Sequence, residues 1–463
     1  MNGKEPPDYR GKRVTVMGLG KFGGNIGAAR WLAEQGARVT VTDLKPAGAF
    51  EEALGQLRDC DLTCRFGGHD RADFTETDLV VASPAVDRES PYLKAARAAG
   101  VTLATEIGLF VTNCPSRICG ITGSNGKTTT VSMTGAILSA SGRTSWIGGN
   151  IGGSLLASID RMIPDDIVVL EISSFQLEWL DELKWSPLVA AILNLSPNHL
   201  DRHRTFEKYR TAKGALLAHQ SPGDTAILVK DPPGSAMYRD SVRSRLLWVG
   251  TENEDDGVTL DGGWIARRSG GTLTRIVESR LIGVPGKHNV LNAMSASACA
   301  LALGIDHTSI VSGLSSFKGV PHRLQLVGER DGVRFYNDSK ATTPESTVMA
   351  VTSFDGRVIP ILGGYDKEVS FDRMAEQIGD KVDWAALIGT TAKKIEAALT
   401  RAGVASQILP SLEDAFRACV RRAQPGNVVL LSPGCASYDM FSDFEERGER
   451  FIELVEEHIR HSS

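Results

Sequence analysis

The chain has 463 residues, too many for a single hydrophobic core, so we expect about three domains. Its 51 basic and 56 acidic residues give a net charge of −5, which provides no basic excess for binding nucleic acid or an anionic membrane. The seven scattered cysteines favour reduced thiols, and the sequence shows neither a signal peptide nor a run of about 18 apolar residues. We therefore expect a soluble, cytoplasmic and monomeric protein.

The first region, residues 1–106, has the pattern of a dinucleotide-binding fold. A buried strand precedes three closely spaced glycines, and the next strand ends at Asp43, 20 positions after the last of them. Glycines at this spacing let the backbone approach a diphosphate, and the acidic residue usually contacts a ribose. By itself the motif favours NAD. The glycines are Gly18, Gly20 and Gly23, and the expected elements are strands at 13–17, 38–42 and 78–82 with a helix ending near 35.

The second region, residues 107–319, opens with a phosphate-binding loop. Glycines allow backbone N–H groups and a helix N-terminus to face phosphate oxygens, while Lys127 adds a positive charge and Thr128 a hydroxyl for Mg²⁺. The spacing is unusual because Ile121 stands where a standard loop has its first glycine. A glycine-rich turn without a ligand is the simpler alternative, but the order of strand, glycines, lysine and threonine favours a nucleotide. The loop residues assigned to the nucleotide are Gly123, Ser124, Asn125, Gly126, Lys127, Thr128 and Thr129.

Two further apolar runs of this region, at 167–170 and 188–193, predict parallel strands that end in polar residues. Between about 246 and 282, short strand-like runs with Gly-Gly turns predict a small antiparallel elaboration. The third region, residues 320–463, again alternates strands and helices and predicts a second Rossmann-like sheet. Its expected strands lie at 334–336, 358–362, 385–388 and 428–431, with a helix at 391–399. The fold class is thus α/β, with a P-loop ATPase-type central sheet between two Rossmann-like domains.

Several segments, spread over the whole chain, resemble those of the Mur ligase family. Besides the phosphate loop they are 149–152, 171–177, 198–203, 213, 288–292, 321–323, 337–342 and 431–437. Segment 171–177 and the turn at 83–86 are most similar to the branch that adds D-glutamate to UDP-N-acetylmuramoyl-L-alanine in peptidoglycan precursor synthesis. The resemblance implies that ATP phosphorylates a carboxylate to an acyl phosphate, which the amine of D-glutamate then attacks.

The resemblance also implies two Mg²⁺ ions and their protein ligands. Thr128 and Glu171 would hold the first ion, because hydroxyl and carboxylate oxygens are hard donors. His199 and a carbamate formed on Lys213 would hold the second, and Lys127, His199 and Lys213 would be the catalytic residues. Without the resemblance, Lys213 is more simply a helix-surface lysine and His199 a capping or packing residue. Further nucleotide contacts implied by the family are Asn292, Arg323 and Asp338.

In this family the N-terminal domain binds the UDP moiety and not NAD, and the chain has no separate hydride-transfer site. The residues expected to contact the UDP-sugar substrate are Leu19, Lys21, Asp43, Ser83 and Asn150. The two carboxylates of D-glutamate call for cations and hydroxyls. The matching positions are Lys340, Thr342, Lys367 and Ser437, with Tyr438 beside them. The sequence departs from the family pattern after Thr342, where Thr343, Pro344 and Glu345 follow, and at Tyr438, where an aliphatic residue is common.

Other functions are compatible with parts of the sequence. A sibling ligase that adds a different amino acid, or a folylpolyglutamate synthase, would share the phosphate loop and the domain order. A nucleotide switch would bind partners without forming an amide, and a Rossmann oxidoreductase would use NAD. Neither of the last two explains the motifs of the second and third regions together.

Overall fold

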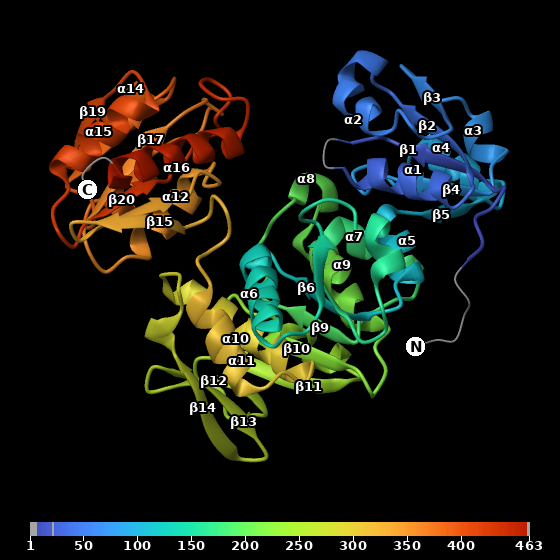
Figure 1. The fold of residues 1–463 in the computed structure, drawn as a ribbon, viewed down its shortest axis with the longest axis horizontal. Coiled ribbons are helices and arrows are strands. Elements are labelled where there is room, and N and C mark those ends of the chain that lie inside the picture. The colour runs from blue at the N-terminus through green and yellow to red at the C-terminus, as the bar shows by residue number, and fades with distance from the viewer. Residues whose placement is uncertain (1–6, 21–22, 461–463) are drawn as a thin grey trace. The chain divides into compact units, whose positions relative to one another are not determined.

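The structure is a computed structural model that describes residues 7–20 and 23–460. The chain divides into two compact units, one comprising residues up to 279 together with 291–313, the other comprising 280–290 and 314–463. The first unit contains two sheets and the second contains one, each flanked by helices (Figure 1). The predicted α/β class with three sheet-bearing domains is confirmed. The exact limits 106 and 319 stay a prediction.

The N-terminal sheet is entirely parallel, with strand order β3-β2-β1-β4-β5. The order reverses between β1 and β4, and in such sheets a ligand crevice lies at the carboxyl ends of the strands beside this switch. Helix α1, Gly24–Glu34, follows β1 as predicted. The strands are β1 Arg13–Met17, β2 Arg38–Asp43, β3 Leu62–Phe66, β4 Leu79–Ala82 and β5 Thr102–Ala104.

The central sheet has nine strands in the order β14-β13-β12-β11-β10-β9-β6-β8-β7. Its strands are β6 Arg117–Thr122, β7 Ser145–Gly149, β8 Ile167–Glu171, β9 Val189–Ile192, β10 Thr225–Val229, β11 Arg245–Gly250, β12 Gly257–Asp261, β13 Trp264–Ser269 and β14 Thr272–Glu278. The strands from β6 to β11 are parallel, and β13 and β14 extend the edge in antiparallel fashion.

The predicted antiparallel elaboration was wrong in one respect. Strand β11 pairs in parallel with both β10 and β12, so the antiparallel part starts only at the β12–β13 pair. A short apolar run does not reveal the direction of its partner, because direction depends on the connection and not on the composition of the strand. The elaboration is therefore a hairpin-like edge on a sheet whose parallel part is longer than expected.

Helices α6 Lys127–Ala140, α7 Ser174–Glu182 and α9 Phe206–Ala218 follow the strands that carry the predicted site. Local sequence explains where two of them start. Ser173 and Gln176 form a reciprocal capping box at α7, and the Thr205 hydroxyl accepts from the Lys208 N–H at α9. The remaining helices of this unit that bear on the site are α5 Glu106–Asn113, α8 Leu200–His203 and α10 Lys287–Ala302, which begins in the second unit.

The second unit has one six-stranded sheet, ordered β15-β16-β20-β17-β18-β19. All pairs are parallel except β15–β16. Its strands are β15 Gln325–Arg330, β16 Val333–Asn337, β17 Val358–Gly363, β18 Trp384–Ile388, β19 Ala405–Ile408 and β20 Val428–Leu431. The predicted helix at 391–399 is α14, Ala392–Arg401, and the chain ends in α16, Phe444–Arg460.

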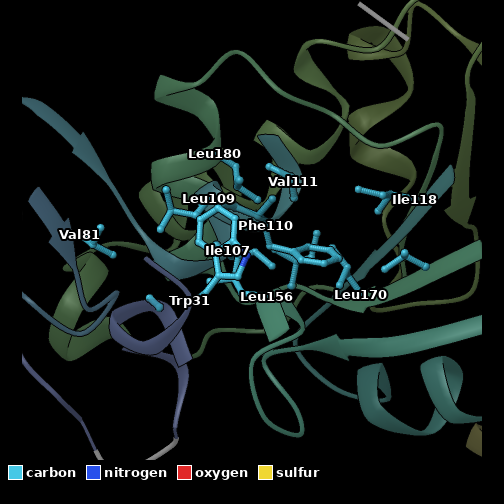
Figure 2. Packing of buried hydrophobic residues seen from close by; sticks show 14 of the residues in the cluster. Trp31, Val81, Ile107, Leu109, Phe110, Val111, Ile118, Leu156, Leu170 and Leu180 are labelled. Atoms are coloured by element: carbon cyan, nitrogen blue, oxygen red, sulfur yellow. The ribbon is translucent and has the colours of Figure 1, made fainter. Parts of the chain in front are cut away.

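The main hydrophobic core of the first unit runs through both of its sheets. Helix α5 supplies its centre with Ile107, Phe110 and Val111, which pack in one cluster with Trp31 of α1 and Leu170 of β8 (Figure 2). Because a buried Phe or Trp side chain contributes on the order of 3 kcal/mol by the hydrophobic effect, α5 is firmly held between the two sheets. None of the described helices combines the length and apolarity needed to cross a bilayer.

Candidate active site

The phosphate loop lies between β6 and α6, as the sequence predicted. Gly126 is the N-cap of α6 with φ +80°, a left-handed conformation that favours glycine. A Cβ at this position would lie 2.4 Å from the Asn292 Oδ1 atom, so α10 closes directly on the loop. The Lys127 ammonium donates to the carbonyls of Gly123 and Ser124 at 3.0 and 3.1 Å. This arrangement keeps a cation and a helix N-terminus at the same point, where an anion is stabilised.

Strand β9 anchors the loop from the neighbouring position in the sheet. The Asn194 side chain accepts from the Asn125 N–H at 2.9 Å and donates to the Asn125 carbonyl at 3.0 Å. This amide therefore pairs with the loop backbone in the way that the backbone of a neighbouring strand would. Ser124 shares a hydrogen bond with the Tyr209 hydroxyl at 2.9 Å and donates to the Ser196 carbonyl at 3.0 Å. These bonds anchor the loop to the segment after β9 and to α9. Sequence spacing does not predict that Asn194, Ser196 and Tyr209 anchor the loop. The polar residues after β9 indicated only that a site lies near this strand end.

A carboxylate at the end of β8 joins the loop to a second glycine turn. The Thr128 hydroxyl donates to one Glu171 oxygen at 2.7 Å, and the Asn150 amide donates to the other at 2.9 Å. Gly149 permits this contact, because at φ +95° a Cβ would lie 2.2 Å from the Glu171 carbonyl oxygen. Three predicted site residues from separate segments therefore meet at Glu171, which is only 2% exposed.

Lys213 is buried and not on the helix surface. It lies on the inner face of α9, 2% exposed, and its ammonium donates to the Thr122 hydroxyl at 3.2 Å and faces the Tyr209 ring. The pKa of Lys213 is lowered to about 7, chiefly by burial and also by nearby Lys127, while Glu171 opposes the shift. About half of a buried lysine with this pKa is uncharged at pH 7, and only the uncharged amine is a nucleophile.

His199 lies in the loop after β9 and is exposed, with φ +52°. Its ring contacts the Phe175 ring of α7 at a centroid distance of 5.1 Å. His203, four residues later, is buried, stacks on the same phenyl ring at 5.3 Å and shares a 2.9 Å hydrogen bond with Ser174. The two histidines thus differ, since His203 is a packing residue while His199 is accessible to a ligand.

Within residues 7–20 and 23–460, no group of three or more His, Cys, Asp or Glu side chains is arranged to hold a metal. The site instead offers one hydroxyl and one carboxylate as possible metal ligands. Thr128 and Glu171 are hard oxygen ligands, which suit Mg²⁺, and the phosphate oxygens of a nucleotide would complete its coordination. An ammonium cannot ligate a cation, so Lys213 would take part only after conversion to an anion.

The carboxyl ends of β1, β2 and β4, where we expect the N-terminal crevice, bring together three of the residues predicted to bind the UDP moiety. The Asp43 carboxylate accepts from the Leu19 N–H at 3.0 Å, so it is directed toward the glycine loop. A Cβ on Gly18 would lie 3.5 Å from the Ser83 Cβ and 4.0 Å from an Asp43 oxygen. Lys21 lies outside the described residues.

In the second unit, Asp338 is enclosed at the end of β16. It accepts from the Leu324 N–H at 3.1 Å and from the Ser432 hydroxyl at 2.8 Å. Burial raises the pKa of Asp338 to about 7, although these hydrogen bonds and the charge of Arg323 act in the opposite direction. The predicted nucleotide contacts Arg323 and Asp338 are therefore electrostatic neighbours.

The residues predicted to bind the amino acid lie on loops that one buried arginine connects. Arg447 of α16 donates to Ser339 Oγ at 2.9 Å, to the Ser339 carbonyl at 2.8 Å and to the Cys435 carbonyl at 3.1 Å. Lys340 and Ser437 stand on these two loops. Lys367 and Tyr438 are exposed, Thr342 is half-buried and Ser437 is buried. The sequence offered no signal for Arg447, which looked like one charge among many in an amphipathic helix.

Comparisons with known proteins match this chain to one family along most of its length. Three family models match: the MurD-like N-terminal domain of Mur ligases over residues 12–105, the Mur ligase middle domain over 121–300, and the Mur ligase glutamate ligase domain over 322–435. Curated relatives named UDP-N-acetylmuramoylalanine--D-glutamate ligase include one from Pelotomaculum thermopropionicum, 38% identical, and one from Geobacter metallireducens, 39% identical. Each alignment covers 97% of this chain and 98% of the relative.

Solved structures show the same fold at lower identity. The UDP-N-acetylmuramate-alanine ligase MurC from Thermotoga maritima is 19% identical with a TM-score of 0.58, covering 96% of this chain and 100% of that one. The MurF ligase from the same organism, in complex with ADP, is 20% identical with a TM-score of 0.56, covering 92% and 96%. With three domain models along its length and relatives of this identity over nearly all of it, the chain belongs to the Mur ligase family.

Proposed function

We propose that this chain joins D-glutamate to UDP-N-acetylmuramoyl-L-alanine through an amide bond, at the expense of ATP. The observation that carries the proposal is its similarity of 38–39%, over 97% of the chain, to relatives named as the ligase of this reaction. Mur ligases depend on ATP, and the phosphate loop described above suits that requirement. The reaction would contribute to peptidoglycan precursor synthesis in the cytoplasm.

The chemistry needs a strong electrophile, which a carboxylate is not. Transfer of the ATP γ-phosphoryl group to a substrate carboxylate oxygen gives an acyl phosphate and ADP. The amine of D-glutamate then attacks the acyl carbon, the C–O bond to phosphate breaks, and the nitrogen loses a proton. Both anionic reactants must approach each other in the first step, so the site has to neutralise charge.

Residues of the first unit are suited to that task. Lys127 would leave its carbonyl partners to contact the phosphates, and Thr128 with Glu171 would hold one Mg²⁺. We place a second Mg²⁺ at His199 and a carbamate on Lys213, formed by addition of CO₂ to the neutral amine with loss of one proton. When bound, Mg²⁺ neutralises charge on the phosphates and the carboxylate. The low pKa of Lys213 supports this assignment because only the free amine reacts with CO₂.

The other proposed contacts fall into three groups, for the UDP-sugar, ATP and D-glutamate. Leu19, Asp43 and Ser83 would face the UDP moiety at the N-terminal crevice, with Asn150 near the rest of that substrate. Asn292 of α10, against Gly126, would contact the nucleotide base. The remaining assignments are Arg323 and Asp338 to ATP, and Lys340, Thr342, Lys367, Ser437 and Tyr438 to D-glutamate.

A panel of amino acids tests the proposed substrate. Phosphate release should require both UDP-N-acetylmuramoyl-L-alanine and D-glutamate. L-Glutamate should be a poor substitute, because inversion of the α-carbon moves one carboxylate away from its cation. Equal rates with both enantiomers, or a preference for a diamino acid, would place the chain in another branch of the family.

A further inference from the structure

Arg202 belongs to the short helix α8, which continues directly from His199. The segment is bounded by two residues in the left-handed region, His199 at φ +52° and Arg204 at φ +64°. Non-glycine residues adopt this conformation at a cost, so surrounding contacts must hold the segment in place. Arg202 supplies several of these contacts.

The Arg202 guanidinium binds three consecutive carbonyls of the turn after β4. It donates to Pro84 at 3.0 Å, to Ala85 at 2.7 Å and to Val86 at 3.1 Å. This turn starts at Ser83 and borders the glycine loop, since a Cβ on Gly18 would lie 3.7 Å from a Val86 methyl group. Arg202, from the segment that follows strand β9 of the central sheet, thus helps to determine the shape of this turn.

The same guanidinium also lies over the Phe175 ring, 4.8 Å from its centroid. Phe175 contacts the His199 ring and stacks on the ring of the buried His203. Four residues before Phe175 is Glu171, the carboxylate that receives Thr128 and Asn150. One side chain therefore touches both the turn of the N-terminal crevice and the aromatic ring that packs against His199.

We infer that Arg202 is a positioning residue that couples binding of the UDP-sugar substrate at the Ser83 turn to the placement of His199. A planar guanidinium with five donors can bind three carbonyls and stack on a ring at once, whereas an ammonium is a point charge without that geometry. A substrate that orders the turn therefore also orders the loop from 197 to 205. The inference rests on the proposed function for the identity of the substrate.

Hydrogen exchange of the loop tests the coupling without ATP or metal. Amide exchange in residues 197–205 is measured with and without UDP-N-acetylmuramoyl-L-alanine, in the wild type, in Arg202→Lys and in Arg204→Met. Arg204 is exposed and two positions away, so its variant controls for the effect of a substitution elsewhere in the same segment. Substrate should slow exchange in the wild type and in Arg204→Met. In Arg202→Lys the substrate should still bind by calorimetry, yet exchange in this loop should not respond.

Turnover gives a second measure. Arg202→Lys should lower kcat on the order of tenfold, a usual size for coupling between sites, while the KM for ATP stays unchanged. Retained substrate-induced protection with normal kcat in Arg202→Lys, or an equal loss in Arg204→Met, would overturn the inference. If the wild type is active but the UDP-sugar does not slow amide exchange in residues 197–205, the inference fails while the proposed function stands. A wild type that neither binds nor converts the UDP-sugar would instead refute the proposed function.

Discussion

Removing CO₂ should inactivate this protein reversibly, with a pH dependence determined by Lys213. The amine is buried against Thr122 and Tyr209, and its pKa falls from 10.5 to about 7. At pH 7 about half of these amines are neutral, compared with roughly one in three thousand for an unshifted lysine. This shift, caused chiefly by burial, thus raises the reactive fraction about a thousandfold, which favours formation of a carbamate at physiological pH.

The sign of the pH effect follows from this shift. Between pH 7 and pH 6 the neutral fraction falls about fivefold, so the activity regained on adding bicarbonate should fall over this range. In CO₂-free buffer the unfolded chain keeps the proton up to about pH 10.5 while the folded protein has lost it above about pH 7. The free energy of unfolding should therefore increase as the pH rises through this window, and Lys213→Met should remove that increase.

The assay is phosphate release in buffers depleted of CO₂, followed by addition of ¹³C-labelled bicarbonate and detection of the carbamate carbon by NMR. Lys213→Ala should be nearly inactive and partly restored by acetate, which supplies an oxygen ligand. Lys208→Ala, on the exposed side of the same helix, is the matched control and should behave as the wild type. Acetate should not restore Lys127→Ala, which lacks a cation.

Two results would refute the reasoning. One is full activity of Lys213→Ala under all conditions. The other is wild-type activity that persists in CO₂-free buffer without any labelled carbamate. Either would return Lys213 to the role of a buried structural amine.

Three other outcomes are expected. Gly126→Ala should weaken ATP binding at least tenfold, because the added Cβ would meet the Asn292 side chain. The control is Gly142→Ala, at φ +70° with nothing within 4 Å, which should cost about 1 kcal/mol of stability and leave the KM for ATP unchanged. Equal effects of the two variants on this KM would contradict the prediction. Because the pKa of Asp338 is raised, the free energy of unfolding of the wild type relative to Asp338→Asn should decrease as the pH rises from about 4 to about 7. Denaturant unfolding measures this difference, and a difference that stays constant would show that the carboxyl keeps an ordinary pKa. Calorimetry should detect UDP-sugar binding at the Asp43 crevice and no NAD binding, and tight NAD binding would overturn that assignment.

Much of the fold was predictable because the strands are buried on both faces and read as continuous apolar runs. The predicted runs at 13–17 and 428–431 are strands β1 and β20. Strands with mixed composition escaped prediction. Strand β19, Ala405–Ile408, lies at a sheet edge and is largely exposed, so it carries no apolar run. The parallel pairing of β11 was missed for another reason, since strand direction is not encoded in a short segment.

The sequence by itself determined the chemical types and their order: a glycine loop with Lys127 and Thr128, a carboxylate after a buried strand, and motifs of one family along the whole chain. These are local patterns, and local patterns are what a sequence displays. The tertiary structure alone decided that Glu171 receives both Thr128 and Asn150, and that Lys213 points inward. A helical lysine has the same sequence signature on either face, and its pKa depends on burial, which arises only when distant strands and helices pack around it.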